Sequence, residues 1–113
     1  MGKTPQGRII YTESGQMAVQ ITRNPQDKVA LEYDKAGEAD VRTAYEQYYA
    51  YFGAYTIDWE RKVVTHKVEA SLRPNEIGLN YERAFTLEGN RLTLVPLVDG
   101  KPSPAKLTWE KVE

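Results

Sequence analysis

Apolar and polar residues alternate with a period of two along most of the chain, and this pattern restricts it to a fold built mainly of β-strands. The alternation is clearest in residues 16–23, where Met17, Val19 and Ile21 fall on one face and Gln16, Ala18, Gln20 and Thr22 on the other. Short polar or glycine-containing turns separate the strand-like segments. The predicted strands are residues 7–12, 16–23, 54–59, 62–72, 79–87, 91–97 and 105–112.

Residues 39–52 follow a different period. Their apolar side chains, among them Tyr45, Tyr48 and Phe52, recur at three- and four-residue spacing, which is typical of an amphipathic helix. Gly53 follows in the position of a helix C-cap, and the polar residues 26–38 before the helix are predicted to form a loop. Seven antiparallel strands in a meander with one inserted helix predict an all-β fold, either a β-barrel or a strongly curled sheet.

The 113 residues are enough for one domain, expected to cover residues 1–113. Fifteen basic and sixteen acidic side chains are interspersed, so the chain lacks the charge pattern of a nucleic-acid binder. No apolar run is long enough to span a membrane, and the N-terminus lacks an apolar signal region, so we expect a cytoplasmic protein. One histidine, no cysteine and no glycine-rich phosphate loop make a metal site or a bound cofactor unexpected.

The single histidine, His66, alternates with apolar residues and therefore points toward the predicted interior. Val64 and Val68 share its face, and on the next strand Arg83 shares a face with Tyr81 and other apolar residues. If these two strands form a hairpin, His66 and Arg83 lie on the same side of neighbouring strands. A buried guanidinium must be paired or solvated, so this pair indicates a polar site inside the sheet.

The interior predicted by this alternation is an apolar cup with a few polar tips, a composition typical of a small-molecule pocket. The opposing interpretation is that His66 is a hydrogen-bonded core residue and that Arg83 lies at a rim with its charged end in solvent. The candidate ligand-binding residues are His66, Arg83, Tyr11, Tyr55, Tyr81, Trp59, Tyr48, Phe85 and Trp109.

Four segments resemble the bacterial and fungal lipocalin-like domain family of small calycin-type barrels, over about residues 5–109. They read GRIIYTESGQMAVQITR, YAYFGAYTID, VTHKVEASLRPNEIG and YERAFTLEGNRLTL. Members commonly carry His, Ser, Pro, Gly and an Arg-x-Phe pair at positions matched here by His66, Ser71, Pro74, Gly78, Arg83 and Phe85.

The chain departs from the family pattern at two places. The family's first strand, with its Gly-Thr-Trp segment, is apparently missing, and Glu76 stands where an aromatic residue is common. A barrel without its first strand has open edges, so we expect a homodimer that pairs or covers them.

Three functions remain open at this stage. The first, which the resemblance also implies, is binding of a small, largely apolar metabolite, with its polar end held by His66 and Arg83 and the helix acting as a lid. The second is a cofactor-independent isomerase, cyclase or hydratase with His66 as general acid or base. In that case a β-bulge could turn Glu69 inward beside His66. The third is a structural or interaction protein whose barrel is packed solid.

Overall fold

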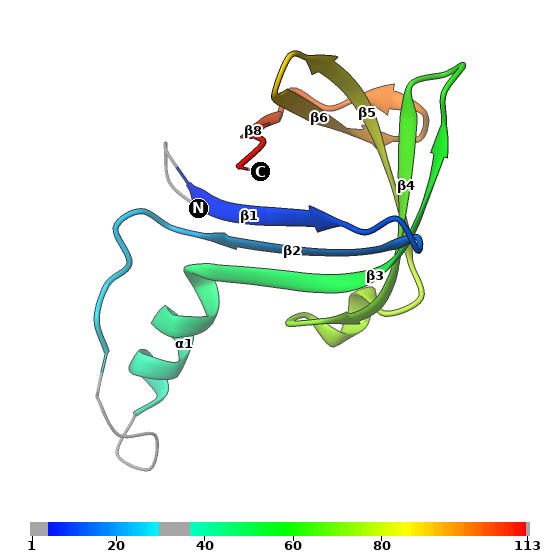
Figure 1. Ribbon diagram of the computed structural model, residues 1–113. Helices are drawn as coiled ribbons and strands as arrows, with labels where there is room; N and C mark the ends of the chain where they lie inside the picture. The colour runs from blue at the N-terminus through cyan, green and yellow to red at the C-terminus, as the bar shows by residue number, and fades with distance from the viewer. Residues whose placement is uncertain (1–4, 30–36, 113) are drawn as a thin grey trace.

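The alternating segments form a single antiparallel sheet that curls strongly about its concave face (Figure 1). The computed structural model describes residues 5–29 and 37–112, which contain eight strands and one α-helix. The predicted all-β class with one inserted helix is therefore confirmed. In chain order the elements are β1 (Gln6–Tyr11), β2 (Gln16–Thr22), α1 (Glu38–Glu46), β3 (Tyr48–Asp58), β4 (Val63–Ser71), a 3₁₀ turn (Pro74–Glu76), β5 (Asn80–Glu88), β6 (Arg91–Val98), β7 (Lys101–Pro102) and β8 (Leu107–Glu110).

Over the described residues, the sheet is an antiparallel meander that does not close into a barrel. Strands β1 to β7 follow one another in chain order, and β8 pairs with β6 rather than with β1. In Figure 1 the β6 and β8 strands therefore face β1 from the opposite side of the curl. Of the two predicted forms, the strongly curled sheet is the one observed.

The helix is shorter than the sequence pattern indicates. It spans Glu38–Glu46, and the chain then enters β3 at Tyr48, so Gly53 lies inside a strand and is not a helix cap. The aromatic residues of the run YYAYF fit a helical stripe, but they are also strong strand formers. Their backbone pairs with all of β2, from Thr22 opposite Tyr48 to Gln16 opposite Ala54, and this pairing decides the conformation.

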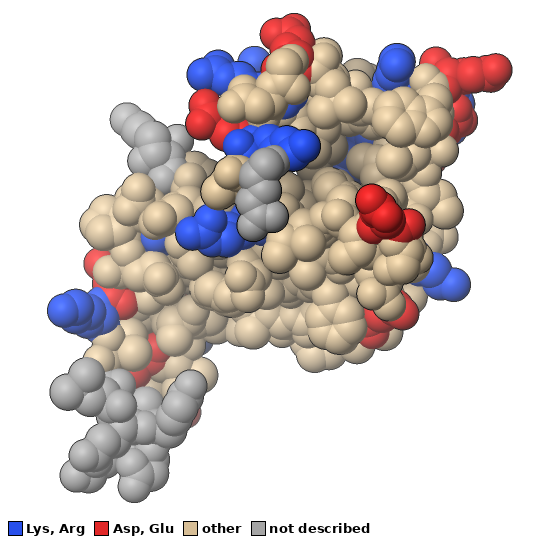
Figure 2. All heavy atoms as spheres, in the orientation of Figure 1, with Lys and Arg blue, Asp and Glu red and all other residues tan. Residues whose placement is uncertain are grey.

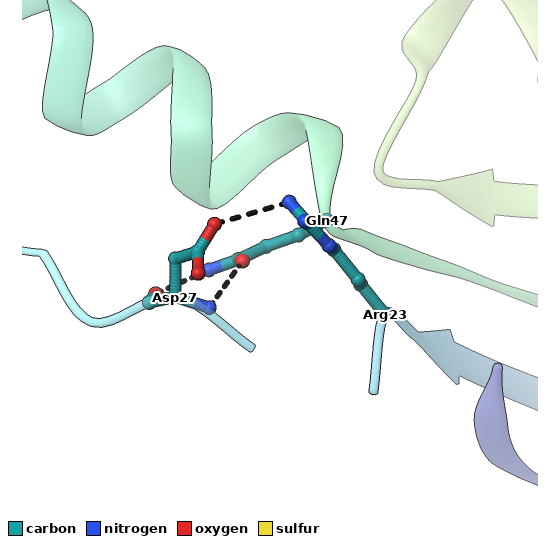
Figure 3. A network of polar contacts seen from close by, with 3 residues as sticks. All are labelled: Arg23, Asp27 and Gln47. Carbon is teal, nitrogen blue, oxygen red and sulfur yellow. Dashed lines mark hydrogen bonds and ion pairs between the residues drawn. The ribbon is translucent and has the colours of Figure 1, made fainter. Parts of the chain in front are cut away.

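Gln47 forms the joint between α1 and β3 (Figure 3). Its side chain is 6 % exposed, and its amide both accepts from the backbone N–H of Asp27 and donates to the Asp27 carbonyl, at 2.7 Å each. Arg23 adds an exposed ion pair to the Asp27 carboxylate at 3.0 Å. The joint thus anchors the segment after β2, while residues 30–36 of the expected loop lie outside the described range.

Helix α1 does not cover the interior of the sheet. None of its residues is buried, and Val41 and Tyr45 are 61 % and 42 % exposed. Figure 1 shows α1 projecting from the start of β3, on the side away from β6 and β8. The expectation that the helix acts as a lid over a ligand is therefore wrong: Tyr45 is exposed on α1, and the other tyrosines assigned to the helix, Tyr48, Tyr49 and Tyr51, belong to β3.

On the outer surface, acidic and basic side chains are intermixed over the face shown in Figure 2. In the described part of the chain, no helix is long and apolar enough to cross a membrane.

A β-bulge in β4 changes which side chains face inward. Phe52 pairs with Ala70 and Gly53 pairs with Val68, so Glu69 is the extra residue between them. Val68 is buried before the bulge, whereas Ser71 reaches an inward hydrogen bond after it. Simple alternation placed Ser71 on the outer face, and the bulge is the physical reason for the difference.

Gly53 is required at this bulge because of its close backbone contacts. A Cβ atom at Gly53 would lie 1.8 Å from the Lys67 carbonyl oxygen, whereas one at Gly37 would meet nothing within 4 Å. We expect Gly53→Ala to lower the free energy of unfolding by about 2–3 kcal/mol or more, as in overpacked cores, and Gly37→Ala by less than about 1 kcal/mol. Urea unfolding measures both variants, and equal losses would contradict this account.

Candidate functional site

The strand register brings the predicted inward residues together on the concave face. His66 of β4 lies opposite Tyr55 of β3 and Tyr81 of β5, and Arg83 lies opposite Val64, one inward position from His66. The two polar residues therefore share a face on neighbouring strands, as the alternation predicted.

His66 is the centre of a buried hydrogen-bonded triad, which we call the tyrosine–histidine triad: Tyr11, His66 and Tyr51. The His66 ring is 1 % exposed. Its Nε2 lies 2.6 Å from the Tyr11 hydroxyl and its Nδ1 lies 2.6 Å from the Tyr51 hydroxyl. The triad crosses the concave face from β1 through β3 to β4, and both histidine nitrogens have a partner within the protein.

Burial and a nearby cation keep this histidine neutral. Desolvation first, and then the positive charge of Arg83, lower the pKa of His66 to about 4. Burial also raises the pKa of Tyr51 to about 12, against the opposing influence of Arg83, and burial likewise raises the pKa of Tyr11. At neutral pH the triad therefore consists of an uncharged imidazole and two protonated phenols.

Arg83 lies beside these aromatic groups rather than with a carboxylate. Its guanidinium carbon stacks 4.8 Å from the centre of the Tyr81 ring, and one nitrogen donates to the Glu82 carbonyl at 3.3 Å. Within residues 5–29 and 37–112, no ion pair joins it to Asp or Glu. Its guanidinium therefore packs on the face of one aromatic ring, and Arg83 is itself only partly buried.

A second polar cluster fills the interior near the turn between β4 and β5. The Glu76 carboxylate accepts hydrogen bonds from Tyr49 at 2.5 Å and from Ser71 at 3.1 Å, and Arg73 stacks on the Tyr49 ring. Partial burial raises the pKa of Glu76, but hydrogen bonds from Tyr49, Tyr81 and Ser71 outweigh it and lower the pKa overall. Glu76, which stands in the sequence as a departure from the family pattern, organises this cluster through its carboxylate.

A hollow of about 160 Å³ with apolar walls lies across the triad from the Glu76 cluster, and we call it the apolar cavity. Side chains of five strands and the β3–β4 turn line it, and it is partly open to solvent. Trp59 is 58 % exposed and packs edge-to-face on Phe85, with ring centres 5.6 Å apart, and together with Leu87, which is 57 % exposed, it stands at the open side. The lining residues are Tyr11, Tyr55, Ile57, Trp59, Val64, Phe85, Leu87, Leu92 and Leu94.

A larger hollow of about 770 Å³ lies between β1 and β8, where the sheet fails to close. We call it the edge groove. Ile9 and Tyr11 line it from β1, and Leu107 and Trp109 line it from β8. Tyr11 is the one residue that lines both the edge groove and the apolar cavity.

Comparison with protein families identifies the fold family of the chain. The model of the lipocalin-like domain matches residues 1–112. The chain belongs to the lipocalin-like domain family. No curated protein and no solved structure matches it. Lipocalin-like domains are associated in general with binding of small hydrophobic ligands.

The structure brings most of the predicted ligand-binding residues of this lipocalin-like chain together. Tyr11, Tyr55, Trp59 and Phe85 line the apolar cavity. His66, Arg83 and Tyr81 lie behind its wall, next to the triad or in it. Trp109 packs against both core clusters, and its indole nitrogen is buried without a partner among the described residues.

Two candidates of the lipocalin-like chain lie elsewhere. Tyr48 pairs with Thr22 at the start of β3, on the face opposite to Tyr49 and Tyr51. Glu69 is exposed at the bulge, beside Phe52 and Ala18 on the outer face. The bulge therefore exists, but it does not turn Glu69 toward His66. Tyr51 and Tyr49 were missed because they were assigned to a helix, and a strand beginning at Tyr48 would have placed both inward.

We predict that His66 titrates near pH 4, well below its ordinary value of about 6.5. Because the folded pKa is lower than the unfolded one, His66 stabilises the fold above pH 6.5, and this stability is lost as the pH falls through about 4. The loss is about 3 kcal/mol. As the only histidine, His66 gives a single set of ring resonances in a proton NMR titration.

Arg83→Gln is the matched variant for this titration, because it removes the charge that lowers the pKa of His66. We expect the His66 pKa to rise in this variant. Carboxylates also titrate between pH 7 and pH 4, in wild type and in His66→Gln alike. The difference between the two proteins in the pH dependence of the free energy of unfolding therefore isolates the contribution of His66. A wild-type midpoint near 6.5 would contradict the burial and charge argument.

Proposed function

We propose that this lipocalin-like domain binds a small, largely apolar molecule in the apolar cavity. The observation that carries the proposal is a cavity of about 160 Å³ whose wall is aliphatic and aromatic and whose mouth is an exposed tryptophan. An apolar cavity of about 150 Å³ in another protein stays dry and takes up benzene. The cavity therefore suits a single-ring or short aliphatic ligand, or one such group of a larger ligand that extends past Trp59.

His66 and Arg83 are proposed to support the ligand's polar end indirectly. Neither residue is in the cavity wall, and both nitrogens of His66 are hydrogen-bonded to tyrosines. Tyr11 connects the two regions, because its ring lines the cavity and its hydroxyl binds His66. In this arrangement the histidine and the arginine set the position and polarity of Tyr11.

The cavity is an argument against a solidly packed barrel, and the state of His66 is an argument against the enzyme hypothesis. A general base works best with a pKa near the operating pH, whereas burial and Arg83 hold His66 at about 4. A catalytic role for His66 or Glu69 and a cytoplasmic location stay predictions.

Binding is tested with toluene as the probe, by chemical-shift titration of the labelled protein. We expect Leu92→Trp to fill the cavity and weaken toluene binding about tenfold or more. A tenfold loss corresponds to about 1.4 kcal/mol of binding free energy. Leu79→Trp is the control, because Leu79 is 47 % exposed and does not line the cavity. No toluene binding by wild type, or equal binding by both variants, would contradict the proposal.

The homodimer expected from the open edges also stays a prediction. Strand β1 pairs on one side only among the described residues, and the edge groove leaves its other side open. We expect sedimentation equilibrium to show a dimer that Ile10→Lys weakens about tenfold or more, because a lysine on an edge strand opposes further pairing. Val98→Lys is the control, because Val98 is about as exposed as Ile10 (63 % and 57 %) but lies on β6 and not on the open edge strand β1. A wild-type monomer at high protein concentration would contradict the prediction.

A further inference from the structure

The edge groove follows two strands along their length. Its lining takes in every residue of 5–11 on one side and of 107–112 on the other. Because the side chains of successive strand residues point to opposite faces, a hollow lined by consecutive residues lies between the two backbones and not above one face of the sheet. Among the described residues β1 pairs with β2 alone and β8 with β6 alone. The free edges of β1 and β8 therefore border the same groove (Figure 1).

The pairing of β1 determines which of its backbone groups point into the groove. In an antiparallel ladder, successive residues direct their N–H and C=O groups to opposite sides of the strand. The Thr12 N–H, directly after β1, donates to the Gln16 carbonyl at 2.8 Å, so every second residue back from Thr12 bonds to β2. The backbone groups of Gly7, Ile9 and Tyr11 therefore point into the groove.

Strand β8 presents backbone groups to the groove from the other side. The Lys111 N–H, directly after β8, donates to the Asn90 carbonyl at 2.7 Å, and by the same alternation Thr108 and Glu110 direct their backbone groups away from β6. Both walls of the groove thus carry backbone donors and acceptors without a ladder partner in the described part of the chain.

The two edge strands run in the same direction. Each of the six strand pairings that lead from β1 to β6 and on to β8 is antiparallel, and an even number of reversals restores the original direction. Direct pairing of β1 with β8 would therefore be parallel, which is slightly less stable per residue. A single strand that runs the opposite way pairs antiparallel with both edges at once.

The side chains along the groove indicate what such a strand would carry. Ile9 and Tyr11 from β1 and Trp109 from β8 line the groove and pack in the core clusters, so every second residue of an inserted strand faces an apolar interior. Side chains at the positions between them face outward, beside Arg8 on β1.

The charges along the groove favour an acidic side chain on the outer face. Arg8 and Lys111 line the groove and are exposed, and within residues 5–29 and 37–112 neither forms an ion pair. The one carboxylate among the lining residues, Glu110, is already paired with Arg91 at 3.3 Å. The unpaired charge at the groove is therefore positive.

We propose that the edge groove binds an extended segment of a partner protein as an additional strand between β1 and β8. The segment has apolar residues at alternate positions, which face inward, and an acidic residue beside Arg8. In this mode of recognition, main-chain hydrogen bonds supply affinity and the alternate side chains supply specificity. The site is distinct from the apolar cavity and adds peptide binding to the binding of a small molecule.

The probe is a fluorescein-labelled peptide, Thr-Val-Thr-Val-Glu-Val-Thr, which places its valines inward and its glutamate beside Arg8 when it runs antiparallel to β1. Two control peptides keep these side chains. One is N-methylated at its valines, whose N–H groups face β1, and the other at its glutamate and middle threonine, whose N–H groups face β8. We expect fluorescence anisotropy to show binding of the probe and a loss of about tenfold or more for each control. Absence of probe binding, or a control that binds as tightly as the probe, overturns the proposal.

A charge exchange tests the place of the acidic residue. We expect Arg8→Glu to weaken probe binding about threefold to tenfold and to favour a peptide with lysine in place of glutamate. Arg42→Glu is the matched control, because Arg42 is exposed on α1 and does not line the groove. Equal effects of the two variants overturn the assignment of the acidic residue to Arg8.

Hydrogen exchange of the wild-type protein separates insertion between two strands from pairing with one. We expect the peptide to slow amide exchange about tenfold or more at the groove-facing residues of both walls, which are Gly7, Ile9, Tyr11, Thr108 and Glu110. Slower exchange on β1 alone means that the peptide, or a second copy of the chain, pairs with a single edge. That result overturns the proposal and leaves binding in the apolar cavity untouched.

Discussion

The hydrogen bonds that His66 shares with Tyr11 and Tyr51 are the interaction on which the rest of the interior depends. Strands β1 and β4 are separated in the sheet by β2 and β3, so a side-chain contact between them requires the sheet to curl. The Tyr11–His66 bond supplies this contact at 2.6 Å. An imidazole with both nitrogens paired can be fully buried at little cost, whereas either nitrogen left unpaired would be expensive. The curl of the sheet brings the Tyr11 hydroxyl to His66, and the hydrogen bond between them in turn holds the curl.

The triad also divides the interior into two chemically different halves. Toward the β4–β5 turn, Glu76 holds hydroxyl groups of Tyr49 and Ser71 in a charged cluster. Toward Trp59, the wall of the apolar cavity is formed by residues such as Val64, Phe85 and Leu94. The concave side of the sheet thus passes from apolar surface near Trp59, across the triad, to the polar groups around Glu76.

Alternation alone was enough to predict the concave face, with His66, Arg83 and Tyr81 on it, because those residues lie in regular parts of β4 and β5. It failed at two irregular places. The bulge at Glu69 reversed the side on which Ser71 falls, and its one mark in the sequence, Gly53 on the facing strand, was interpreted as a helix cap. The aromatic run after Gln47 fits both periods, and only pairing with β2, a contact distant in sequence, resolved it. The strand beginning at Tyr48 carries Tyr49 and Tyr51, so this one boundary error hid half of the polar interior.

The ligand site and the open edge of the sheet share one strand. Tyr11 is the last residue of β1, and β1 is paired on one side only among the described residues, with β2. On its concave side β1 is held by the Tyr11–His66 bond and by the packing of Ile9 and Tyr11 against both core clusters. A strand that pairs with the free side of β1 would fix the backbone that carries Tyr11. Because Tyr11 also lines the apolar cavity, a strand paired at this edge would hold in place one wall of that cavity together with the Tyr11–His66 bond.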